Sequence, residues 1–291
     1  MRITNKYNLP QSLVNAVTVE KHNKPGCVSA TTLLQGVKQI LLTDRHWDEL
    51  EDDVSNRVWS IHGTAVHKLL EESNPNAFTE EHFEIPVKTD TGDTLTVTGQ
   101  VDLYDMENMV VTDYKNTSVW KVIFKSFDDW KKQGEIYAWL MKENGLEVRK
   151  CRFIAMLRDW EKKKAQYDET YPQLPVYVFE FDIGEEELEE GKTIAVEKAN
   201  AISNAMKLSD DDIEPCTSEE RWEKKEKYAV MKKGRKSALK VCDTQEDAEE
   251  IAKARGGYVE VRKGTCDKCT GYCMCKEFCN FYKENVEENE I

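Results

Sequence analysis

The stretch VTGQVDLYDMENMVVTDYKNT, residues 97–117, constrains the fold most, because it reads as one short β-hairpin that carries acids on both arms. If the turn is centred on Glu107 and Asn108, Asp102 lies directly opposite Asp113. The Cβ atoms of opposed residues are ~4.5–5.5 Å apart, and like charges at that separation are destabilising. A divalent cation between the two carboxylates makes the arrangement favourable instead. Hard oxygen ligands of this kind suit Mg²⁺ or Mn²⁺.

A lysine shares this face of the hairpin. Lys115 lies two residues beyond Asp113, which places both side chains on the same side of the strand. In a metal site the acids would hold an ion that lowers the pKa of a bound water, and the lysine would position that water. A solvated edge strand that carries charges to prevent edge-to-edge pairing explains the same residues without catalysis. The hairpin alone leaves both interpretations open.

Two helical segments add polar residues at a spacing of four. In GTAVHKLLE, Gly63, His67 and Glu71 line one helix face, and Gly63 would let another backbone approach closely. In WKKQGEIYAWL, Gln133 and Tyr137 also share a face. Each segment is also consistent with an ordinary amphipathic helix.

The order of periodic segments predicts a mixed α/β domain whose central sheet is flanked by helices. Helices are expected over residues 29–50, 54–72, 127–145 and 185–207, and strands near 82–87, over the hairpin, and over 151–157 and 176–183. The pattern changes after Pro215. We therefore expect three parts: a core over 1–214, a small basic β-β-α-β insert over 215–265, and a cysteine-rich segment with an acidic tail over 266–291.

Composition narrows the class of protein. The 291 residues are 40% hydrophobic and 33% charged, without an apolar run near the ~20 residues of a membrane helix. The N-terminal residues lack an apolar signal region, so we expect a cytoplasmic protein, in the host cytoplasm if a phage encodes it. The net charge of −14 argues against a general nucleic-acid binder. However, residues 221–240 hold nine Lys and Arg against two Glu, so a local basic surface is compatible with that total.

Nine cysteines are unevenly distributed, and five of them fall within residues 266–279. In a reducing cytoplasm such a cluster more often binds metal than forms disulfides. A wholly local tetrahedral Zn²⁺ site would use Cys266 and Cys269 with two of Cys273, Cys275 and Cys279.

Four motifs, in order, resemble the PD-(D/E)XK nuclease superfamily, specifically its RecB-like branch of AddB-like, CRISPR-associated and phage recombination exonucleases. They are Gly63-x-x-x-His67, Gly99-x-x-Asp102, Asp113-x-Lys115 and Gln133-x-x-x-Tyr137. The resemblance implies a restriction-endonuclease-like core. It also implies that His67, Asp102, Asp113 and the Tyr114 carbonyl bind metal, and that Lys115 is the catalytic lysine. Gln133 and Tyr137 would orient Lys115 and the scissile strand, and Glu71 is a weaker candidate near the metal.

The same resemblance implies an iron–sulfur cluster that holds the C-terminus to the core. Relatives use one distant cysteine and three near the end, which here gives Cys216 with Cys269, Cys273 and Cys279 as ligands of a [4Fe–4S] cluster. Four thiolates suit iron and zinc alike, so the Zn²⁺ alternative with Cys266 stays open.

A basic turn in the insert completes the set of candidate residues. Lys232, Lys233, Arg235 and Lys236 surround a glycine and would contact phosphates without sequence preference, although a solvated turn also fits. Together the features predict an Mg²⁺- or Mn²⁺-dependent DNA exonuclease acting on single strands or duplex ends. Its setting would be phage or bacterial recombination, repair or replication, with partner proteins possible. The alternatives are a non-catalytic nucleic-acid-binding accessory protein and an RNA-directed nuclease.

Overall fold

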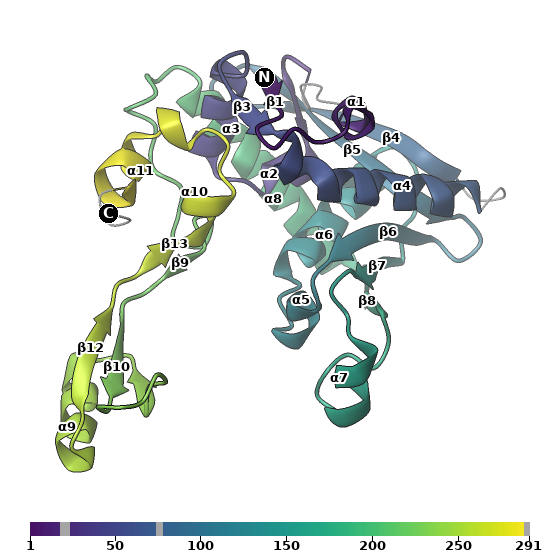
Figure 1. Cartoon of the computed structure of the whole chain (residues 1–291). Helices are drawn as coiled ribbons and strands as arrows, with labels where there is room; N and C mark the ends of the chain where they lie inside the picture. Colours follow the sequence, from purple (N-terminus) through teal and green to yellow (C-terminus); the bar gives the residue numbers. More distant parts are fainter. Residues whose placement is uncertain (18–23, 74–77, 288–291) are drawn as a thin grey trace. The chain divides into compact units, whose positions relative to one another are not determined.

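The computed structural model describes residues 1–17, 24–73 and 78–287, and it divides into two compact units, Met1–Leu208 and Ser209–Ile291 (Figure 1). The side chain of Glu71 lies outside what is described. No helix within these ranges has both the length and the apolar character that crossing a bilayer requires.

A six-stranded mixed sheet forms the centre of the first unit, as expected for a mixed α/β fold. Strand β5 pairs with β4 and β6 in antiparallel and with β2 in parallel orientation, and β7 pairs with β6 in parallel and with β8 in antiparallel orientation. The strands are β2 (Cys27–Ser29), β4 (Phe78–Lys88), β5 (Thr94–Asp105), β6 (Val110–Thr117), β7 (Lys150–Leu157) and β8 (Val176–Asp182).

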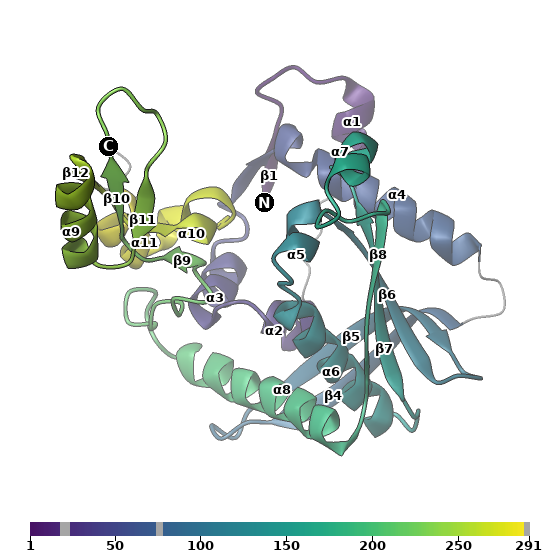
Figure 2. The same ribbon diagram turned by 90° about the horizontal axis from the view of Figure 1, so that it is seen from below.

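Two long helices, α6 (Asp128–Glu143) and α8 (Glu185–Ala205), lie side by side on this unit (Figure 2). Their backbones approach closely at Gly191, where an added Cβ would be 2.1 Å from the Glu135 carbonyl oxygen. Helix α6 also contacts β4, β5 and β7, so it is fixed between the sheet and α8. The position of every side chain on α6 therefore depends on this packing.

Strand β7 shows why the sheet has a well-defined core. Its buried residues alternate along the chain as Cys151, Phe153, Ala155 and Leu157. Phe153 stacks on Trp130 of α6 with ring centroids 5.7 Å apart. Period-two burial of this kind specifies the register, because a slip of one residue would expose the apolar set.

The single helix expected over 29–50 is wrong. The structure instead has α2 (Ala30–Leu33) and α3 (Val37–Arg45), preceded by strand β2. Gly36 between them is extended, with ψ of 140°, and it begins α3. The apolar spacing continues across the break, which is why periodicity alone did not reveal it.

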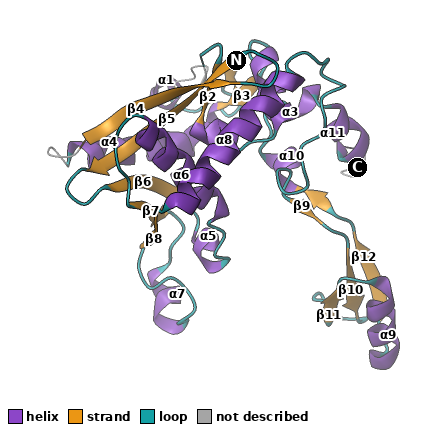
Figure 3. Cartoon of the chain, turned by 180° about the vertical axis from the view of Figure 1, so that it is seen from behind, coloured by secondary structure: helices purple, strands orange, loops and turns teal. Residues whose placement is uncertain are grey.

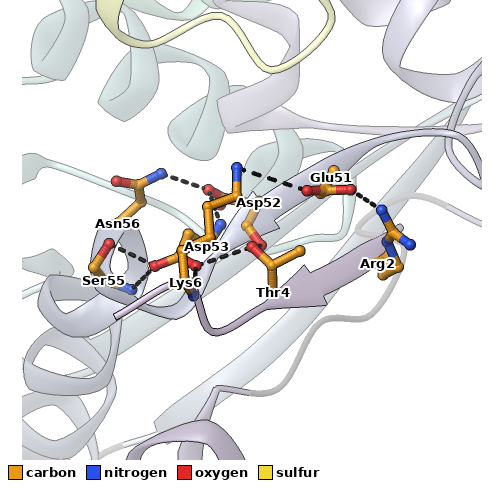
Figure 4. Close-up of polar contacts among 8 residues, drawn as sticks. All are labelled: Arg2, Thr4, Lys6, Glu51, Asp52, Asp53, Ser55 and Asn56. Atoms are coloured by element: carbon orange, nitrogen blue, oxygen red, sulfur yellow. Dashed lines mark hydrogen bonds and ion pairs between the residues drawn. The ribbon is translucent and has the colours of Figure 1, made fainter. Parts of the chain in front are cut away.

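The N-terminus forms a feature that the sequence did not predict. Strand β1 (Arg2–Thr4) pairs in parallel with β3 (Glu51–Asp53), and polar contacts join them (Figure 4). Asp53 accepts hydrogen bonds from the Lys6 amide at 2.8 Å, the Thr4 hydroxyl at 2.9 Å and the Ser55 hydroxyl at 2.7 Å. These donors, the Lys6 amide foremost, hold the pKa of the Asp53 carboxyl below its ordinary value.

Asp53 also caps the short 3₁₀ helix η1 (Val54–Arg57), which leads directly into α4 (Val58–Glu72). The start of α4 is therefore tied to the N-terminal strand. Three further short helices, also not predicted, are α1 (Gln11–Ala16), α5 (Val119–Ile123) and α7 (Lys162–Tyr167).

The second unit contains a small sheet with its own helix (Figure 3). Strand β10 (Lys227–Met231) lies between β11 (Lys240–Cys242) and β12 (Tyr258–Arg262), and α9 (Gln245–Arg255) packs on them. Val230, Cys242, Ala248 and Ala252 form a separate buried cluster. At the base of this insert, β9 (Glu223–Lys224) pairs with β13 (Thr265–Cys266). The cysteine-rich end follows as α10 (Asp267–Gly271), η2 (Lys276–Phe278) and α11 (Asn280–Asn285).

Candidate functional site

The candidate site lies where β5 and β6 separate. Their ladder runs from Asp105↔Val110 to Leu103↔Thr112, which is the register expected from the sequence. The turn is a four-residue loop over 106–109, in which the Asp105 carboxylate accepts hydrogen bonds from two loop amides. In the described pairing the ladder stops before Asp102 and Asp113, so the two strands form a fork there.

Asp102 spans this fork. Its Oδ2 accepts a hydrogen bond of 2.7 Å from the Tyr114 amide of β6. Its Oδ1 lies 3.5 Å from Nδ1 of His67, which α4 supplies. The Asp102 carboxylate raises the pKa of His67, and partial burial of the imidazole opposes that shift. One carboxylate thus fixes an amide and an imidazole from two other elements.

Asp113 is buried beside the lysine that follows it. Nζ of Lys115 lies 2.7 Å from Asp113 Oδ2, and Nε2 of Gln133 donates a hydrogen bond of 3.2 Å to Oδ1. Burial raises the pKa of Asp113, and the Lys115 ammonium opposes that rise. The ammonium is the one partner of Oδ2 among the described contacts. This oxygen retains a lone pair that a cation could use.

Helix α6 completes the polar chain. Gln133 Oε1 accepts a hydrogen bond of 2.9 Å from Lys115 Nζ, and Gln133 Nε2 donates one of 2.7 Å to the Tyr137 hydroxyl. Burial raises the pKa of Tyr137 well above its ordinary value, so the phenol keeps its proton at neutral pH. Since the hydroxyl oxygen accepts from Gln133, its own proton remains available to an acceptor in the adjoining cavity.

Gly99 allows α6 to approach this closely. A Cβ at Gly99 would lie 2.7 Å from Leu140 Cδ1 and 3.2 Å from the Tyr137 ring. A larger residue would have to displace the Leu140 methyl and would press on the Tyr137 ring. The glycine of the Gly99-x-x-Asp102 motif therefore positions the tyrosine of another motif.

Gly63 does not have the role expected from its spacing. A Cβ at this position would meet nothing within 4 Å, so no neighbouring backbone packs there. The open space belongs to a cavity of about 870 Å³. His67, Asp102 and Tyr137 line this cavity together with polar residues from α2, α4 and β5. The glycine keeps the cavity wide, which the sequence could not distinguish from close packing.

The candidate residues have the right donor atoms for a metal ion, but their side chains are not arranged around one. Asp102, Asp113, His67 and the Tyr114 carbonyl provide the oxygen and imidazole donors that Mg²⁺ or Mn²⁺ accepts. Over residues 1–17, 24–73 and 78–287, however, no three His, Cys, Asp or Glu side chains are grouped tightly enough to enclose an ion as they stand. These side chains would have to move closer together to enclose an ion.

The second unit gathers several of the cysteines. Burial, together with the nearby thiols of Cys266, Cys273, Cys216 and Cys279, raises the pKa of Cys269 to about 12. Both candidate fourth ligands, Cys216 and Cys266, are therefore among its neighbours. Cys275 is buried, with its Sγ 3.6 Å from that of Cys273. Cys151 and Cys242 are buried apart from this group, in β7 and β11.

The basic turn follows β10. Gly234 adopts φ of 86°, and the Arg235 amide donates to the Lys232 carbonyl at 3.0 Å. The four cationic residues of the turn, Lys232, Lys233, Arg235 and Lys236, are exposed. Their contact with phosphates stays a prediction.

One polar link to α4 was missed at the sequence level. Asn116, directly after Lys115, contacts His62 with Nδ2 and Nδ1 2.7 Å apart. This contact joins the end of β6 to the helix that carries His67. Its only sequence signal is position, because both residues directly follow or precede motif residues.

No protein-family model matches the chain, and no curated protein matches it in sequence. Among solved structures it is similar to the crystal structure of SSO0001, with a TM-score of 0.45, 17% identity, and coverage of 68% of this chain and 86% of that one. It is also similar to a phage-related exonuclease from Haemophilus somnus 129PT, with a TM-score of 0.37, 13% identity, and coverage of 62% and 96%. Structural similarity this distant assigns no function. A function can be inferred only from the chemistry of the site.

Proposed function

We propose that this chain is a metal-dependent nuclease of the PD-(D/E)XK type, RecB-like branch, with a restriction-endonuclease-like core. The observation that carries the proposal is the pair of buried Asp113 and half-buried Lys115 at a strand fork, held by Gln133 and adjoining Asp102. A solvated edge strand would expose these charges, whereas Asp113 is 4% exposed. Burying a carboxylate is costly, and carboxylates shifted in pKa by burial and a specific charge partner concentrate at functional sites.

The reaction would be hydrolysis of a DNA phosphodiester bond. A divalent cation bound by His67, Asp102, Asp113 and the Tyr114 carbonyl would supply an activated water and neutralise phosphate charge. Mg²⁺ or Mn²⁺ is proposed because carboxylate and carbonyl oxygens dominate the donor set.

The protein's own groups position the reactants. Lys115 keeps its ammonium fixed between Asp113 and Gln133, from where it can donate to the attacking water and to a phosphate oxygen. Tyr137 can donate its phenolic proton to a second phosphate oxygen. Its hydroxyl oxygen accepts a hydrogen bond from Gln133, so the proton is not used in that contact. Donors fixed before the reaction stabilise charge that develops in the transition state.

Three residues of the site, His67, Asp102 and Tyr137, line an open cavity, which is compatible with a strand end entering it. We therefore propose an exonuclease on single-stranded DNA or duplex ends, in phage or bacterial recombination, repair or replication. The exposed basic turn at 232–236 would add phosphate contacts that weaken with salt.

For the second unit we propose a [4Fe–4S] cluster bound by Cys216, Cys269, Cys273 and Cys279. Its role would be structural, holding the C-terminal segment to the base of the small insert. Iron and sulfide analysis of anaerobically purified protein tests this, with Cys216→Ser and Cys266→Ser compared side by side. The assignment requires loss of iron in Cys216→Ser only; zinc without iron, or dependence on Cys266 instead, contradicts it.

The activity is tested by degradation of end-labelled single- and double-stranded DNA with Mn²⁺, Mg²⁺ or EDTA. Lys115→Ala and Asp113→Asn should each lower the rate by at least about 100-fold while DNA binding is retained. Lys142→Ala, an exposed lysine at the end of α6, is the matched control and should cut like the parent. Metal-independent cutting, or full activity in Asp113→Asn, would show that the site is wrongly assigned.

A further inference from the structure

Large aromatic rings are exposed where β6 and β7 end. Trp120 of α5 and Phe124, the residue that caps its C-terminus, are 53% and 72% exposed, and Trp59 at the start of α4 is 55% exposed. Aromatic rings contribute most of their free energy when they are covered. A group of them left in water marks a surface that binds something.

The three rings, which we call the ridge, lie on segments that a backbone hydrogen bond brings together. Trp120 and Phe124, four residues apart in the chain, stack with centroids 5.5 Å apart and planes inclined by 25°. The guanidinium of Arg158 lies 5.1 Å from the centre of the Trp59 ring. The Arg158 amide in turn donates to the carbonyl of Thr117, the last residue of β6, at 3.0 Å. The segments that carry the ridge therefore meet where β6 and β7 end.

The ridge is held firmly and lies near the candidate site. Ser118 caps α5, and Asp159 accepts hydrogen bonds from the Ser118 hydroxyl at 2.6 Å and the Val119 amide at 2.7 Å. Lys115 precedes Ser118 by three residues of the same chain segment. At ~3.3 Å per extended residue, the start of α5 is about 10 Å from the lysine backbone.

Cations alternate with the rings. Lys125 follows Phe124 and Arg158 covers Trp59, whereas the Lys121 ammonium on α5 is paired with Asp129 at 2.6 Å. Flat apolar faces interleaved with positive charge match the faces of unpaired bases and the phosphates between them. A duplex does not offer its base faces, because they are stacked within the helix. Charge and shape thus favour one occupant, a single strand.

We infer that Trp120, Phe124 and Trp59 form a stacking platform for the unpaired bases of a single-stranded DNA whose backbone continues to Lys115. The inference rests on the proposed nuclease function and specifies its substrate as the single strand. Stacking is tolerant of sequence, because every base has a π-face. The platform would hold the strand without selecting a sequence.

The test compares two double variants in a Lys115→Ala background, in which DNA is bound but not cut. Trp120→Leu/Phe124→Leu keeps apolar side chains and removes the rings, whereas Trp120→Tyr/Phe124→Tyr keeps rings. Titration with fluorescent oligo-dT should show at least about tenfold weaker binding for the Leu pair. The Tyr pair should bind within about threefold of the background protein, as should Tyr7→Leu, an equally exposed ring outside the ridge.

A second readout uses the Lys115-containing enzyme. The Leu pair should raise KM for oligo-dT and leave hydrolysis of bis-p-nitrophenyl phosphate unchanged, because that small diester does not reach the ridge. Unchanged oligo-dT binding by the Leu pair, or equal loss in the Leu and Tyr pairs, overturns the platform. If the parent cuts nothing, the nuclease proposal fails, and the binding titration still decides whether the ridge stacks bases.

Discussion

Tyr137 illustrates how burial decides what a side chain can do chemically. A phenol with a raised pKa is a poor base, and at neutral pH it can only donate a proton in a hydrogen bond or accept one. Because Gln133 already donates to it, the phenolic hydrogen must find its acceptor elsewhere. A phosphate oxygen in the cavity is the acceptor that the proposed reaction would bring.

Tyr137→Phe should therefore lower kcat by about 10–100-fold with little change in KM, since the missing hydrogen bond is one that strengthens as charge develops. Its stability cost should be about 0.5–1.5 kcal/mol, the range of one hydrogen bond. Tyr104→Phe is the control, because that hydroxyl donates to the Glu147 carbonyl and touches nothing in the site. Equal kcat in both variants would remove Tyr137 from the reaction.

Asp53 gives a prediction on acid stability. Its folded-state pKa is depressed below the ordinary 3.8 by donors from Lys6, Ser55 and Thr4. A depressed pKa contributes stability that is present above pH ~4 and is lost as pH falls toward the folded-state value. Asp53→Asn should lower Tm at neutral pH, and the difference from the parent should shrink below pH ~4. A difference that stays constant from neutral pH to about pH 3 would contradict this.

At the residue level, the sequence predicted the register of the hairpin because a turn centre and a period of two are local properties. It did not predict that the ladder stops before Asp102, because where a ladder ends depends on tertiary packing and not on the local pattern. Gly63 was misinterpreted for a related reason. A small residue on a helix face leaves room either for a backbone or for a cavity, and only the tertiary structure distinguishes them.

Two glycines in helices provide a contrast at the level of elements. Gly191→Ala should destabilise the protein by about 2–3 kcal/mol, because the new Cβ would collide with the Glu135 carbonyl of α6. The backbone of a packed helix cannot move far enough to relieve this collision. Gly63→Ala should stabilise α4 by about 1 kcal/mol, the gain in helix propensity. The same methyl would narrow the cavity and slow cleavage. Chemical denaturation of both variants, with activity measured in parallel, checks the opposite signs.

Long elements could be predicted and short ones could not. The helix expected over 127–145 is observed as Asp128–Glu143, and the strand expected over 151–157 as Lys150–Leu157. Strands β1 and β3 have three residues each, too few for any periodic pattern. They exist because distant segments pair, and the polar network around Asp53 supports them.

At the level of the whole molecule, the small insert should be removable. Lys224 and Thr265 are paired neighbours in β9 and β13, so an Asn-Gly turn could replace residues 225–264 between them. The insert also has its own buried cluster, so no other core should be opened. The shortened protein should keep its thermal transition and its hydrolysis of a small diester. Its DNA binding should weaken, with a smaller dependence on salt.

The control for that experiment neutralises the turn without deleting it. Replacing Lys232, Lys233, Arg235 and Lys236 by Ala should reproduce the smaller salt slope, by roughly 0.7 for each phosphate of a single strand that the protein no longer neutralises. If the deletion weakens binding and the four-residue variant does not, the phosphate contacts lie elsewhere in the insert. If neither changes the slope, the basic turn takes no part in binding.

Strand β5 is the one element in the described sheet that pairs with three others, β2, β4 and β6. A single inserted residue between Gly99 and Asp102 would turn one of these two residues to the opposite side of the sheet, while the flanking pairings held both ends in place. The loop over 106–109 has no such constraint, because extra residues there only lengthen a hairpin connection. Length variation in related chains should therefore accumulate at this loop and be absent from residues 94–105. Strand β5 is then the reference segment from which related sequences should be aligned.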